Sequence, residues 1–181
     1  PPIREPWDYL IDPLKDAIKY ADVLLAEVRE AEIEHWGPNC ATFSAALEIP
    51  IPGVRNPPKP KRSRSCPEGL PEILNRAGGA KHDKGRQRVI DDTFMANMAA
   101  EECMRAHSEG RGFTLEHPGR SIALHLPSWK KLMSMEGVHT IFHHHCRFEP
   151  CEKRKYQVII TNIPQLVDKI GLLCRSSRVC E

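Results

Sequence analysis

Three short segments of the sequence hold side chains that could do chemistry. They are Gly37–Ser44, which contains Cys40, then Leu115–Pro118, which contains Glu116, and Phe148–Tyr156, which is rich in basic residues. A thiolate is a nucleophile, a carboxyl group can exchange protons, and lysine or arginine can hold a phosphate. Each segment is predicted to stand at a strand end, where open parallel sheets place their ligands. Taken singly, each is a weak signal.

Each of these features also has a plainer interpretation. Cys40 alone could be a small buried apolar residue, and Glu116 could be a surface cap or ion-pair partner. The run His143–Cys146, followed by Cys151, contains the usual ligands of zinc. Successive residues on a strand point to opposite faces, so at most two of these histidines converge. We therefore expect a strand end and loop there, and no metal site.

Together and in this order, the segments resemble motifs of the DNA cytosine carbon-5 methyltransferases, which belong to the class I S-adenosylmethionine-dependent superfamily. Those motifs are a Pro-Pro-Cys-Gln loop often followed by Phe-Ser, a Glu-Asn-Val strand end, and a Pro-Gln-x-Arg-x-Arg segment that runs into a strand. The resemblance is closer to a divergent methyltransferase-like group familiar in protist and mobile-element sequences, and it covers roughly residues 31–174. The matching stretches are GPNCATFS, KPKRSRSCPEGLP, EHPGRS and CRFEPCEKRKYQVIITN.

The resemblance implies a covalent mechanism in which Cys40 adds to carbon-6 of a cytosine in DNA. Glu116 would hydrogen-bond ring nitrogen 3 of that base, which must be flipped out of the duplex or already single-stranded. The residues implied in holding nucleic acid are Ser44, Arg62, Arg64, Lys153, Arg154 and Lys155. Those implied in contacting S-adenosylmethionine are Pro38, Asn39 and Asn162.

Several positions depart from the family pattern. Asn39 replaces the proline before the cysteine, His117 follows the glutamate, and Cys151 stands where the family has glutamine. Lys153 and Lys155 replace two arginines and cannot make their bidentate contacts. The sequence contains no Phe-x-Gly-x-Gly cofactor loop, so we expect the chain as given to bind S-adenosylmethionine poorly. A non-catalytic methyltransferase-fold remnant that binds nucleic acid is therefore the alternative hypothesis.

Hydrophobic spacing predicts the elements that must position these residues. Helices are expected from Asp12 to about Val28, from Arg88 to about Glu109, from Pro127 to about Met135 and from Pro164 to about Leu173. Strands are expected at residues 31–36, 113–116, 138–142 and 156–162. This alternation favours an α/β domain with a mostly parallel sheet and helices on both faces. With the resemblance, it implies one domain over residues 1–181, a three-layer Rossmann-like methyltransferase sheet that is incomplete at its N-terminus.

Charge is unevenly distributed along the chain. Residues 1–48 hold ten acidic and four basic side chains, whereas residues 55–88 hold ten basic and three acidic ones. Such a local positive excess suits a polyanion such as DNA, although a solvated loop is the simpler alternative. Proline and glycine recur through residues 48–88, which favours a long loop that either serves the site or is a disordered linker.

The cysteines and the apolar runs bear on location. Seven cysteines occur without a paired Cys-x-x-Cys motif, and the sequence has neither a secretory signal nor 18 consecutive apolar residues. We therefore expect reduced thiols in an intracellular compartment, nuclear if the source is eukaryotic, and no membrane partner. Because the sequence starts without methionine, we also expect it to be part of a longer protein.

Overall fold

A computed structural model describes residues 26, 29–44, 55, 59–75, 84–147 and 155–171 of the 181-residue chain. The chain divides into two units, Pro1–Glu32 and Ile33–Glu181. Most of the helix predicted after Asp12 lies outside the described residues, and Ala26, Arg29 and Glu30 near its end are helical. The elements below all belong to the second unit.

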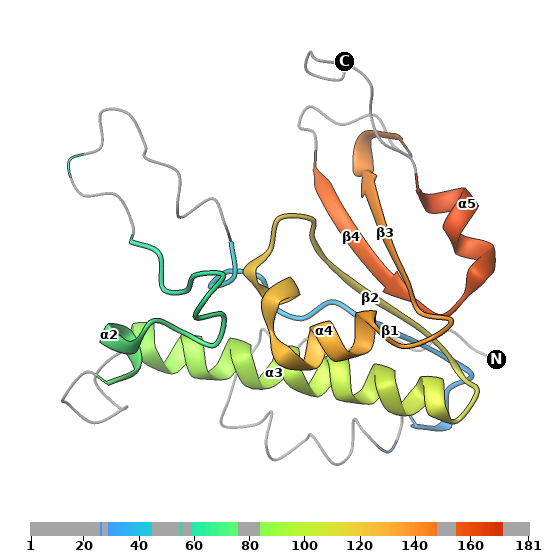
Figure 1. Cartoon of the computed structure of the whole chain (residues 1–181), viewed down its shortest axis with the longest axis horizontal. Helices are drawn as coiled ribbons and strands as arrows, with labels where there is room; N and C mark the ends of the chain where they lie inside the picture. Colours follow the sequence, from blue (N-terminus) through green and yellow to red (C-terminus); the bar gives the residue numbers. More distant parts are fainter. Residues whose placement is uncertain are drawn as a thin grey trace. The chain divides into compact units, whose positions relative to one another are not determined.

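The second unit contains both strands and helices (Figure 1). Its strands are β1 (Ile33–Trp36), β2 (Gly112–Pro118), β3 (His139–His144) and β4 (Tyr156–Thr161). Its helices are α2 (Pro71–Leu74), α3 (Lys84–Ser108), α4 (Pro127–Met133) and α5 (Val167–Ile170), with 3-10 turns η2 (Ile122–His125), η3 (His145–Arg147) and η4 (Pro164–Leu166). The four predicted strands are confirmed, and α3 begins at Lys84 instead of Arg88.

The sheet is mixed, with strand order β1-β2-β4-β3. Only β1 and β2 are parallel, because α3 forms the long crossover between them. β4 runs antiparallel to both β2 and β3, so the prediction of a mostly parallel sheet is wrong. No α-helix stands between β3 and β4 in the described part of their connection, and β4 runs back alongside β3.

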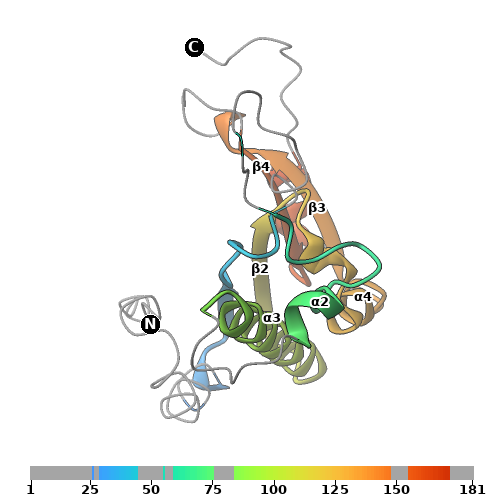
Figure 2. The ribbon, with the colours of Figure 1, turned by 90° about the vertical axis from the view of Figure 1, so that its left-hand side faces the viewer.

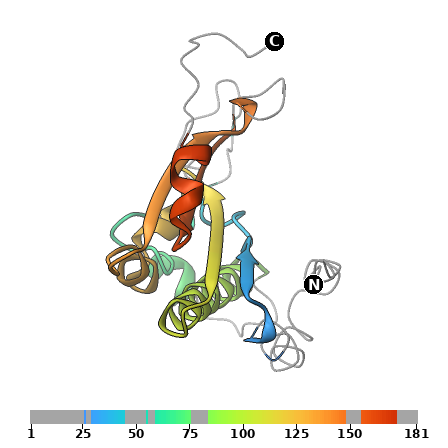
Figure 3. The same cartoon turned by 90° about the vertical axis from the view of Figure 1, so that its right-hand side faces the viewer.

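The core lies between the sheet and the pair α3 and α4. Strand β2 alternates strictly, and Phe113 and Leu115 on its inner face are fully buried beside Ile160 of β4 and Trp129 of α4. The short helix α5 contacts β3 near Ile141, on the other face, and lies in front of the strands in Figure 3 and behind them in Figure 2. The fold is therefore a four-stranded mixed α/β sheet with helices. In the described part of the chain, no helix has the length and apolar character that crossing a membrane requires.

Candidate functional site

Cys40 and Glu116 lie at the same edge of the sheet. β1 and β2 are parallel neighbours in which Trp36 pairs with Leu115, so the chain passes from β1 into the Cys40 loop beside Glu116. Cys40 is half-buried, as is Glu116. Because the carboxyl ends of parallel strands form one rim, the Cys40 loop and the strand end that carries Glu116 lie at the same end of the sheet.

Backbone hydrogen bonds join this loop to the turn after β2. The amide of Ile122 donates to the carbonyl of Phe43 over 2.9 Å, and the amide of Gly119 donates to the carbonyl of Tyr156 over 2.9 Å. A Cβ atom at Gly119 would lie 2.6 Å from the Tyr156 ring, so this close approach requires glycine. The segments that carry Cys40, Glu116 and the start of β4 thus meet at one rim.

Arg62 is a buried clamp on the Cys40 loop. It is 2% exposed, and its guanidinium carbon lies 3.8 Å from the centre of the Phe43 ring. Its Nε and Nη2 groups donate to Thr42 Oγ1 over 3.1 and 2.9 Å. Further bonds go to the carbonyls of Pro67 and Val89 and to Thr93 Oγ1. Burial lowers the pKa of Arg62 to about 10, although the charges of Asp92 and Glu68 oppose this change. Arg62 therefore holds the loop and is placed away from any nucleic-acid surface.

Asp92 of α3 fixes the same loop from the other side. It is 4% exposed and accepts hydrogen bonds from the Thr42 hydroxyl over 2.5 Å and from Asn39 Nδ2 over 3.0 Å. The other end of the Asn39 amide, Oδ1, accepts from the Ala41 amide over 3.1 Å. The Asn39 side chain is thus committed to shaping the turn that presents Cys40, which leaves it little capacity for a cofactor.

Glu116 lies on the sheet face opposite α3 and α4. Strand alternation separates it from the buried neighbours Leu115 and His117, and Gln157 Nε2 donates a hydrogen bond to its Oε1. Gln157 is a site residue that sequence reasoning missed. Its signal is a polar amide within the otherwise β-branched and aromatic start of the Tyr156–Thr161 strand.

The remaining predicted nucleic-acid contacts are spread around this rim. Ser44 ends the Cys40 loop and is half-buried, whereas Arg64 and Lys155 are exposed. Lys153 and Arg154 lie outside the described residues. Arg64 and Lys155 are therefore the predicted basic residues that the structure places at the surface.

Asn162 follows β4 beside the start of β2, at the opposite end of the sheet from Pro38 and Asn39, which follow β1. Its Oδ1 accepts from the Phe113 amide over 2.9 Å, and its Nδ2 donates to the Arg111 carbonyl over 2.7 Å, where β2 begins. At about 3.4 Å per residue, the five residue steps from Phe113 to Pro118 at the end of β2 span roughly 17 Å. The three predicted cofactor contacts do not come together.

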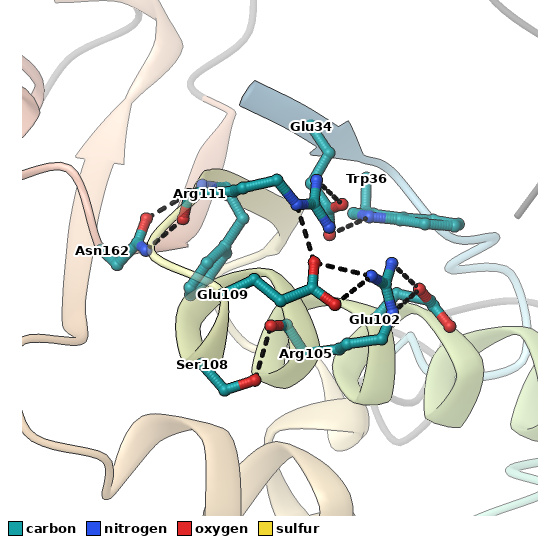
Figure 4. Close-up of polar contacts among 9 residues, drawn as sticks. Glu34, Trp36, Glu102, Arg105, Ser108, Glu109, Arg111 and Asn162 are labelled. Atoms are coloured by element: carbon teal, nitrogen blue, oxygen red, sulfur yellow. Dashed lines mark hydrogen bonds and ion pairs between the residues drawn. The ribbon is translucent and has the colours of Figure 1, made fainter. Parts of the chain in front are cut away.

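Charged side chains close that far end of the sheet. Glu34 of β1 is 4% exposed, and its carboxylate accepts from Trp36 Nε1 over 3.0 Å and from Arg111 Nη1 over 3.3 Å (Figure 4). Burial raises the pKa of Glu34, and the hydrogen bond from Trp36 and the Arg111 charge oppose that rise. Glu109 extends the cluster by pairing with Arg111 and Arg105. Since these charges satisfy one another, we interpret this cluster as structural.

The histidine run falls where a strand ends. β3 stops at His144 and the turn η3 starts at His145. Within the described ranges, no three His, Cys, Asp or Glu side chains are grouped so that they could hold a metal ion.

Comparison with protein-family models, curated proteins and solved structures found no match to this chain. The function of the rim therefore rests on its side-chain chemistry and on the position of its residues.

Proposed function

We propose that this chain is the base-binding part of a methyltransferase-like protein that acts on nucleic acid, with cytosine carbon-5 in DNA as its target. The finer fold within this proposal is the three-layer sheet of class I methyltransferases. The observation that carries it is that the Cys40 loop and Glu116 leave two adjacent parallel strands at one rim. A planar base placed there would have a thiol and a carboxyl group beside it.

The chemistry of such a pair is thiol addition to a pyrimidine. The Cys40 thiol gives its proton to water, its sulfur forms a bond to carbon-6, and the electrons of the 5,6 double bond move toward ring nitrogen 3. A proton from Glu116 at nitrogen 3 neutralises the charge that develops there. Carbon-5 becomes the nucleophilic end of an enamine and can take up an electrophile. Loss of a proton from carbon-5 to water, return of the nitrogen 3 proton to Glu116 and expulsion of the sulfur as a thiolate restore the aromatic ring.

S-adenosylmethionine would supply the methyl group in a complete enzyme. The described residues do not fit a binding site for it, because the side chains of Asn39 and Asn162 are both engaged in backbone hydrogen bonds and lie at opposite ends of the sheet. The proposal for this chain therefore concerns base recognition and thiol addition, and it includes no step on the cofactor.

A non-catalytic nucleic-acid-binding role is the alternative, and a specific observation favours it. Arg62 docks its segment onto the Cys40 loop, and Arg64, two residues along the same segment, is exposed. A basic surface held at a rim can bind phosphates without any reaction at Cys40. This role needs the clamp and the exposed charges, and it does not need the thiol.

Hydrogen exchange at cytosine carbon-5 separates the two roles without a methyl donor. DNA carrying tritium at carbon-5 of cytosine, with target bases unpaired, is incubated with the chain, and tritium released into water is counted. Thiol addition predicts release that Cys40→Ser abolishes and that the matched change Cys66→Ser, at another half-buried cysteine, retains. DNA binding without release supports the binding role alone, and the absence of both contradicts both proposals.

A further inference from the structure

Three polar side chains lie in a row on the sheet face opposite α3 and α4. Glu116 on β2, Gln157 on β4 and His143 on β3 occupy neighbouring strands. In the register, His143 is directly opposite Gln157, while Glu116 pairs with Ile159 two positions along β4. Residues two apart on a strand share a face, so Gln157 stands between the carboxyl group and the imidazole.

Contacts link the three groups in sequence. Gln157 Nε2 donates to Glu116 Oε1, and a hydrogen bond joins the Gln157 side chain to His143. His143 is only 5% exposed, and burial lowers its pKa. The Glu116 charge and the Gln157 bond oppose that shift, whereas the neighbouring His145 and His144 add to it. The imidazole on β3 is therefore coupled to the carboxyl group on β2 through Gln157 of β4, which lies between them.

We propose that Gln157 and His143 are positioning residues that fix which oxygen of Glu116 faces the base; this rests on the proposed function. The Gln157 amide gives its N–H to Glu116, which leaves its carbonyl oxygen to accept from an N–H of His143. Glu116 Oε1 is then held as an acceptor. Any proton on the carboxyl group is placed on Oε2, to which no described residue donates.

When the carboxyl group carries a proton, the fixed position of that proton gives the rim a preference among pyrimidines. Nitrogen 3 of cytosine is an acceptor, whereas nitrogen 3 of uracil or thymine carries a proton and is a donor. An Oε2–H group can donate to nitrogen 3 of cytosine. Against uracil or thymine it faces another donor, the N–H at nitrogen 3, so neither group gains a hydrogen bond. Without the Gln157 bond, the carboxyl group is free to turn and this discrimination falls.

The coupling is tested by NMR titration of His143 in the intact chain. Glu116→Gln and Gln157→Leu should each lower the pKa of His143, because each removes an interaction that favours the imidazolium. The matched change His139→Phe, on the same face of β3 but opposite Thr161 at the far end, should leave it unchanged. An unaltered His143 pKa in Gln157→Leu would overturn the proposal.

The consequence for the site is tested by tritium release. His143→Phe removes the N–H donor and should slow release on the order of tenfold to a hundredfold, as expected when a reacting group is misplaced. His143→Gln keeps an N–H and should restore most of the rate. Gln157→Leu should reduce the preference for DNA with an unpaired cytosine over DNA with an unpaired uracil. Equal rates of tritium release in the wild type, His143→Phe and His143→Gln would overturn the positioning role.

The NMR titration and the tritium-release assay can give negative results independently of each other. A wild-type chain that releases no tritium contradicts the proposed thiol chemistry and removes any catalytic role for this row. The NMR titration then still decides whether Gln157 and His143 hold the Glu116 carboxyl group.

Discussion

At the scale of single residues, His117 occupies an unusual place for an ionisable group. Its ring is 2% exposed and lies edge-on between Phe43 and Trp129, with ring centres 5.9 and 5.2 Å away. Neither ring nitrogen has a hydrogen-bond partner of normal geometry in the described structure. The imidazole therefore acts as an aromatic spacer that supports the Cys40 loop.

This burial makes stability depend on pH. Burial lowers the pKa of His117 from 6.5 to about 4, against a smaller opposing effect of the Asn39 backbone. Between these values the unfolded chain binds a proton that the folded chain does not, so the free energy of unfolding falls as pH drops from about 6.5 to 4. The loss reaches about 3 kcal/mol at most.

Urea unfolding at pH 7 and pH 4.5 measures this effect, with His117→Phe as the comparison. The variant should lose less stability on acidification than the wild type. Burial also lowers the pKa values of His125 and His143. These two residues therefore make the same contribution to the pH dependence of stability in the wild type and in His117→Phe. Equal losses in the two proteins would contradict the assignment to His117.

At the scale of elements, one buried arginine holds three segments together. Arg62 comes from the loop before α2 and reaches both the Cys40 loop and the backbone of α3 at Val89. Asp92 of α3 completes the arrangement by binding Thr42 of the same loop. The position of the candidate nucleophile is thus set by contacts between elements that are distant in sequence.

Arg62→Met should destabilise the fold strongly. Methionine fills a similar volume but leaves Asp92, which is 4% exposed, without its nearby positive charge. Removing one partner of a buried charged network costs about 3–5 kcal/mol. Arg64→Met, two residues away and exposed, should change stability by no more than about 0.5 kcal/mol. Chemical denaturation of both variants checks this, and similar losses would show that the clamp is not specific.

The elements were more predictable than their arrangement. The β-branched run that forms β4 and the spacing within α3 indicated both elements, because those patterns depend on local sequence. The direction of β4 did not follow from the sequence, since pairing depends on contacts between distant strands. The antiparallel result corrected the mostly parallel prediction.

The candidate site was predictable in part for the same reason. Motif order placed Cys40 and Glu116 on one rim, and the pairing of β1 with β2 agrees. Arg62 was predicted as a nucleic-acid contact, but its burial depends on how three segments pack. Gln157 was missed because a register shift of one residue would move its side chain to the other face.

At the scale of the whole molecule, positive charge gathers near the rim. Lys61 and Arg64 belong to the segment that Arg62 docks, and Lys155 starts β4. Arg64 also lies near the turn η2, where burial and then the charges of Arg64 and Lys130 lower the pKa of His125. These groups come from separate segments, and we propose that together they form a cationic surface that a phosphate backbone could follow.

Binding of DNA to this surface should weaken steeply with salt, because each neutralised phosphate releases counterions. For duplex DNA, the slope of log affinity against log salt is about −0.9 for each phosphate contact. Arg64→Gln should reduce the size of that slope by roughly one. Lys169→Gln removes the same charge from exposed α5, on the other face of the sheet, and should leave the slope unchanged. Fluorescence anisotropy across a salt series measures the slope for the wild type and both variants. Equal slopes in the wild type and Arg64→Gln would mean that DNA does not contact the docked segment. A slope near zero in the wild type would exclude the cationic surface altogether.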